Sequence, residues 1–185
     1  MIWAICGFVL FLILFTVFGA PVKSYILEHE LSHMIFALLS GVRISSVSFK
    51  RSNAYVKTDR INIFIALAPY SLPLYTVMLV ILYRLIRHIA MSPFADSVFC
   101  FLFGVTLSFH FIATIHYIQL DQPDMKRYGY FSSVVFITTW SIVIISIMLA
   151  FMFSDIQFIL YFRSSLRETI QIYTWLIDLF NRFFA

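Results

Sequence analysis

Charged side chains are scarce in this sequence. Only 12% of its 185 residues are Asp, Glu, Lys or Arg, whereas 62% are hydrophobic and 22 are Phe. Soluble globular domains have about a quarter charged residues and about half apolar ones. The composition therefore excludes an ordinary soluble domain, and several apolar blocks reach the length of about 20 residues that crosses a bilayer. We predict an all-α, multi-pass membrane protein.

Cysteine and net charge are also low. The only two cysteines, Cys6 and Cys100, lie in apolar runs, so they supply neither a framework of disulfides nor a cysteine metal site. The net charge of +4 comes from basic residues that are spread over the loops. Binding to nucleic acid needs a concentrated basic surface, so we expect the lipid bilayer, and no nucleic acid, as a partner.

The apolar blocks predict about five transmembrane helices. The first block lacks the basic n-region of a secretory signal and is followed at once by Pro21, so we interpret it as a retained span. Pro69 and Pro73 should kink the third span, and the carbonyl groups that they free must be bonded by protein or water. The predicted spans are about Ile2–Ala20, Val22–Ser40, Ile61–Tyr83, Phe94–Leu120 and Tyr128–Phe153.

Two segments differ from these spans. Val42–Asp59 is rich in β-branched residues around a polar turn, which predicts a short β-hairpin with an irregularity at Ser45-Ser46. Residues 155–185 alternate polar and apolar side chains every three or four positions, which predicts an amphipathic helix in the membrane interface or packed on the bundle or a partner. We therefore divide the chain into a membrane domain, 1–154, and a C-terminal helix, 155–185.

The second span contains the sequence H-E-L-S-H at residues 29–33. Side chains at i and i+4 lie one turn apart on the same face of a helix. His29 and His33 can therefore bind one Zn²⁺, and Glu30 can act as the general base of a metallohydrolase. Ionisable residues within a spanning helix are costly and indicate function. Glu28 is one helical step away from the metal-binding face.

Zinc also needs a third protein ligand and an open position for water. Asp124 is our first choice, since it follows Pro123, a residue suited to the first turn of a helix. Asp121 and His116 stay open as alternatives. His110 lies about 16 Å along the helix axis from Asp121, so the two cannot share a metal in a continuous helix. We expect His110 to be a packing residue or to support a ligand.

The hairpin side of the membrane is the expected side of the metal centre. His33 lies seven residues before Ser40, about 10 Å below that surface at the helical rise. Asp124, which we expect to open the fifth helix, approaches from the same side. Asn53, Asn62 and Gln119 are candidates for further polar contacts around the reacting group.

Residues 21–136 resemble the site-2 protease family of intramembrane zinc metalloproteases. The resemblance rests on H-E-L-S-H early in an apolar helix, on Gly41 and the hairpin that follows, and on an Asp after a Pro where a later helix begins. It implies His29, His33 and Asp124 as zinc ligands and Glu30 as the catalytic residue. The family's L-D-G signature is absent, since Met125 follows Asp124, and no PDZ or CBS-like segment is recognised, so we expect a minimal or divergent member of the family.

The resemblance implies a zinc metalloendopeptidase. Its substrate would be a membrane protein, cleaved in or near a transmembrane segment that unwinds locally and pairs with the hairpin edge. Two alternatives stay open: a non-catalytic, protease-like subunit that acts in binding or assembly with a partner membrane protein, and a metal transporter. Basic residues are more frequent on the hairpin side, so we expect a bacterial cytoplasmic membrane with the site nearer the cytoplasmic face.

Overall fold

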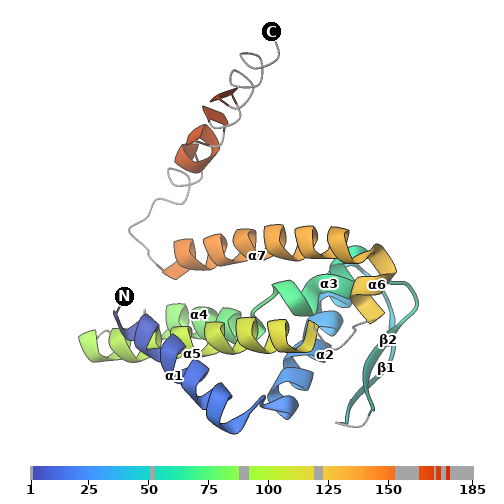
Figure 1. Cartoon of the computed structure of the whole chain (residues 1–185), viewed down its shortest axis with the longest axis horizontal. Helices are drawn as coiled ribbons and strands as arrows, with labels where there is room; N and C mark the ends of the chain where they lie inside the picture. The colour runs from blue at the N-terminus through green and yellow to red at the C-terminus, as the bar shows by residue number, and fades with distance from the viewer. Residues whose placement is uncertain are drawn as a thin grey trace. The chain divides into compact units, whose positions relative to one another are not determined.

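The computed structural model describes residues 2–50, 53–87, 92–118, 123–152, 163–168, 170–171 and 174–175. These residues are mostly helical and include one small antiparallel sheet (Figure 1). The chain divides into two compact units, residues 1–146 and 147–185. The predicted helix at 155–185 lies largely outside the described residues, although 163–168 are helical.

The first two helices form a sharply bent pair. α1 spans Ile2–Phe18 and α2 spans Val22–Leu39, with a bend of 120° between them. Gly19 lies in the break with a φ of +77°, a conformation that glycine adopts without strain. α2 ends as predicted at Gly41, where the N–H groups of Gly41 and Val42 bond carbonyls of the last helical turn.

The predicted β-hairpin is confirmed. β1 (Ile44–Lys50) pairs in antiparallel fashion with β2 (Asn53–Thr58), and the register shifts between Ile44 and Ser46. The expected irregularity at this point is therefore confirmed as well. Both strands pack against α2, which brings the hairpin next to the helix that carries H-E-L-S-H.

The predicted kink in the third apolar block is also confirmed. α3 (Ile63–Ser71) and α4 (Leu74–Arg87) are bent by 74° around Leu72 and Pro73. Pro73 cannot donate the hydrogen bond that would continue α3, so the two helices point in different directions. α3 packs closely against α2.

α5 (Pro93–Ile118) packs along α1 (Figure 1). Gly7 and Gly104 lie at the crossing, and a Cβ atom on either one would overlap a backbone carbonyl of the other helix. The two backbones therefore touch, as small residues allow in membrane helices. The Ser108 hydroxyl adds a hydrogen bond of 3.0 Å to the Phe8 carbonyl.

The segment around Asp124 differs from the prediction. Asp124 opens a separate short helix, α6 (Pro123–Tyr128), rather than the fifth span, and α7 (Tyr130–Met152) follows. Gly129 separates them with a φ of +81°. A residue in the left-handed conformation ends a right-handed helix, so the chain changes direction between the carboxylate and the apolar helix.

The described residues contain two helices that are each long and apolar enough to cross a membrane, Pro93–Ile118 and Tyr130–Phe151. The bent pairs α1–α2 and α3–α4 pass the same test only as pairs, which gives up to four spans. The chain therefore has the character of a membrane protein. The predicted number of five transmembrane helices is not confirmed.

Candidate metal centre

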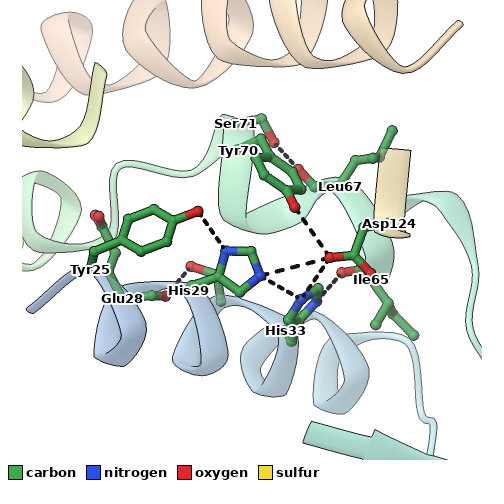
Figure 2. Close-up of polar contacts among 10 residues, drawn as sticks. Tyr25, Glu28, His29, His33, Ile65, Leu67, Tyr70, Ser71 and Asp124 are labelled. Atoms are coloured by element: carbon green, nitrogen blue, oxygen red, sulfur yellow. Dashed lines mark hydrogen bonds and ion pairs between the residues drawn. The ribbon is translucent and has the colours of Figure 1, made fainter. Parts of the chain in front are cut away.

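Three elements bring the candidate ligands together. His29 and His33 lie one turn apart on α2, and Asp124 lies in the first turn of α6. α3 packs against both of these helices, so it holds them at a common position. Figure 2 shows both imidazole rings and the Asp124 carboxylate pointing toward one another.

The three donor atoms lie close together. The Nε2 atoms of His29 and His33 are 3.2 Å apart, and Asp124 Oδ2 is 3.7 Å from the first and 3.6 Å from the second. Among the residues that the structure describes, these three form the one group of His, Cys, Asp or Glu side chains with this proximity.

These separations fit a tetrahedral zinc ion. Nitrogen and oxygen ligands bind zinc at about 2.0–2.2 Å, so pairs of ligands around a tetrahedral ion lie about 3.3–3.6 Å apart. The three separations between donor atoms, 3.2 to 3.7 Å, agree with this range to about 0.1 Å. Two imidazoles and one carboxylate are also a donor set that zinc prefers, and three ligands leave one position open.

Each imidazole has a second hydrogen-bond partner at Nδ1. His33 Nδ1 donates to the backbone carbonyl of Ile65 at 2.7 Å, and His29 Nδ1 lies 3.2 Å from the Tyr25 hydroxyl. A proton on Nδ1 leaves the lone pair on Nε2, the form that binds metal. The Ile65 carbonyl, which can only accept, therefore favours coordination of His33 through Nε2, while the Tyr25 hydroxyl contacts the Nδ1 side of His29 and leaves its Nε2 facing Asp124.

Asp124 is held as a carboxylate. Burial by itself would raise the pKa of Asp124, but the two neighbouring imidazoles of His29 and His33 outweigh burial and hold this pKa well below its usual value. The Tyr70 hydroxyl also donates to Asp124 Oδ2, at 3.2 Å. The ring of Tyr70 meets His29 edge to face, with centroids 5.3 Å apart, so one side chain contacts two of the three candidate ligands.

Glu30 borders the same space as the candidate ligands. Its side chain is only 7% exposed and lines a cavity of about 320 Å³ together with His29, His33 and Asp124. Four residues of β2, namely Ala54, Tyr55, Val56 and Thr58, also line this cavity. A buried carboxylate in the same cavity as the donor atoms can exchange a proton with a water molecule held there.

The other candidate ligands are placed elsewhere or are not described. Asp121 and Gln119 lie outside the described residues. His116 is exposed and packs its ring against Phe15, with centroids 5.6 Å apart. It is not part of the group formed by the three donor residues, so the structure does not bring His116 to this site.

Glu28 and His110 form a separate buried pair. Glu28 Oε1 lies 3.5 Å from His110 Nδ1, and both side chains are almost fully buried. The same Glu28 oxygen accepts the N–H of Tyr75 in the first turn of α4, at 3.4 Å. Glu28 thus links α2 to α4 and α5. His110 is therefore a buried packing residue, which was one of the two roles expected for it.

The structure describes the side chain of only one of the two asparagines that were candidates for polar contacts around the reacting group. The Asn62 side chain accepts the N–H of Ile65 at 2.8 Å and donates to the Ser40 hydroxyl at 3.2 Å. Asn62 is therefore the N-cap of α3. The side chain of Asn53 lies outside the described residues.

The sequence reasoning missed Tyr25, Tyr70 and the Ile65 carbonyl. Tyr25 had a signal, because it lies four residues before His29 and so shares its helix face. Tyr70 and Ile65 had none, because their proximity to the ligands depends on how α3 packs against α2 and α6.

Comparisons with protein-family models, with curated proteins and with solved structures find no match for this chain.

Proposed function

We propose that the chain is an intramembrane zinc metalloprotease of the site-2 protease type. The observation that supports it best is the spacing of the donor atoms of His29, His33 and Asp124, which fits a tetrahedral zinc ion. Glu30 lines the same cavity and would supply the general base that a metallohydrolase needs. The proposed cofactor is Zn²⁺.

In this mechanism Glu30 carries the proton. It takes a proton from the attacking water and returns it to the leaving amine when the peptide bond breaks. When bound, zinc would act as a Lewis acid that lowers the pKa of water toward about 7 and polarises a carbonyl. Tyr25, Ile65 and Tyr70 hold the ligands in their positions through the hydrogen bonds described above.

The proposed substrate is a membrane protein that is cleaved in or near a transmembrane segment. A peptide bond in a lipid-embedded helix is already hydrogen-bonded, so the segment must unwind, and its free backbone groups then need partners. β2 borders the cavity, and its edge can pair with an extended substrate by β-augmentation. The break at Pro73 is the joint at which helix movement would admit this segment.

The alternative is a protease-like subunit that binds partner proteins without catalysis. Zinc content distinguishes the two. Purified native chain should contain about one zinc per molecule, and Asp124→Ala should lose most of it. Asp96→Ala, which removes a carboxylate that bonds Tyr83 at the end of α4, is the matched control and should keep native zinc. A native chain without zinc would refute the metalloprotease.

A further inference from the structure

Pro69 lies inside α3 and removes one donor from it. In an α-helix the N–H of residue 69 would bond to the carbonyl of Ile65, four residues earlier, but proline has no N–H. Ile65 is only 2% exposed, and a buried carbonyl without a partner is costly. The carbonyl of Ile65 therefore needs a donor from outside α3.

His33 supplies this donor. Its Nδ1 lies 2.7 Å from the carbonyl oxygen of Ile65, in a hydrogen bond that joins α2 to α3 (Figure 2). A carbonyl only accepts, so Nδ1 of His33 carries a proton, and Nε2 is the nitrogen left to bind a metal. Nε2 is the atom that faces His29 and Asp124.

We propose that Pro69 is a positioning residue for the metal centre, which rests on the proposed zinc site. By lacking an N–H, Pro69 leaves the Ile65 carbonyl to His33, and this bond fixes the tautomer in which Nε2 binds metal. The pyrrolidine ring adds to the effect, because in a helix it clashes with the carbonyl four residues earlier and turns it outward. An alanine at position 69 would compete for the same carbonyl.

Pro73 provides a matched control. It is buried like Pro69 and lies in the break between α3 and α4. In a continuous helix an N–H at position 73 would bond to the carbonyl of Pro69, four residues earlier, and not to the carbonyl of Ile65. Pro73→Ala therefore changes the same broken helix but leaves the acceptor of His33 unchanged.

The test measures zinc affinity and the tautomer of His33 in the full chain in detergent micelles. Competition with a chromogenic chelator gives the affinity, and nitrogen NMR of zinc-free, histidine-labelled protein gives the tautomer. We expect Pro69→Ala to bind zinc about 10-fold more weakly, the lower end of the loss when a metal ligand loses its hydrogen-bond partner. His33 should then populate both tautomers, whereas Pro73→Ala should match the native chain.

Thermal unfolding separates positioning from a general structural role. Removing a proline from a helix interior favours the helix, so Pro69→Ala should unfold at the native temperature or above while its zinc affinity falls. Native affinity in Pro69→Ala, or an equal loss in Pro73→Ala, would contradict the proposal. If the native chain binds no zinc, the proposed function fails, and the tautomer in zinc-free protein still shows whether Pro69 controls His33.

Discussion

The groups behind the candidate ligands are neutral hydrogen-bond partners in the chain interior. Tyr25 and the Ile65 carbonyl contact the two imidazoles, and Tyr70 donates to Asp124. Such partners fix the orientation of a ligand and tune its affinity for metal without adding charge. The absence of added charge is important in a low-dielectric environment, because each further charged group would itself need a charged or hydrogen-bonding partner.

Tyr70→Phe should therefore weaken zinc binding. The change removes the hydroxyl that donates to Asp124 and keeps the ring that contacts His29. We expect a loss of about 10-fold in zinc affinity, measured by chelator competition. Tyr83→Phe, which removes a hydroxyl bonded to Asp96 far along the chain, is the control and should keep native affinity. Equal affinities in all three proteins would show that Tyr70 does not support the ligand.

The sequence could predict the two histidines and favoured Asp124 as the third donor, but it could not exclude Asp121 or His116. The i, i+4 spacing of His29 and His33 determines their shared face in any helix. Asp121 and Asp124 are separated by only two residues, and both precede the same apolar helix. Only the packing of α6 against α3 shows that Asp124 reaches the imidazoles.

Breaks between helices shape this site as much as the helices themselves. Gly129 separates α6 from α7, and Pro73 separates α3 from α4. The kink and the hairpin were predictable because proline and β-branched residues act locally. The separate helix α6 was not predicted, because a glycine at the start of an apolar block, such as Gly129, is compatible with a continuous helix as well as with a break.

β2 supplies a test of the substrate path. Ala54 lines the cavity beside Glu30, so the bulky side chain in Ala54→Trp should fill space that the substrate backbone needs. We expect cleavage of a membrane substrate to fall at least 10-fold while zinc content stays native. Ser46→Trp, on the exposed strand β1, is the matched control. Native cleavage by Ala54→Trp would mean that the substrate does not pass β2.

The proposed membrane orientation rests on the distribution of basic residues around the predicted spans. Seven basic residues accompany the hairpin and the segment before α7 in the sequence, whereas three, together with the arginines of the C-terminal tail, are predicted for the opposite side. The first set is Arg43, Lys50, Arg51, Lys57, Arg60, Lys126 and Arg127, and the second is Lys23, Arg84 and Arg87. Short loops rich in Lys and Arg stay cytoplasmic, so we propose that the site opens toward the cytoplasm.

Cysteine labelling tests this orientation. In a background with Cys6→Ala and Cys100→Ala, an impermeant maleimide should label Ser46→Cys only in inverted vesicles. Lys23→Cys, at the other end of α2, should react only in intact cells. The opposite pattern would place the candidate metal centre on the outer side of the membrane.

The most direct test of the whole account compares the native chain with Glu30→Gln. Both proteins should hold about one zinc per molecule, because Glu30 is not among the three donor residues. Each is co-expressed with a library of membrane proteins, and new peptide termini are identified by mass spectrometry. We expect termini within or beside transmembrane segments for the native chain and none for Glu30→Gln. Identical sets of termini from two zinc-loaded proteins would contradict proteolysis by this site.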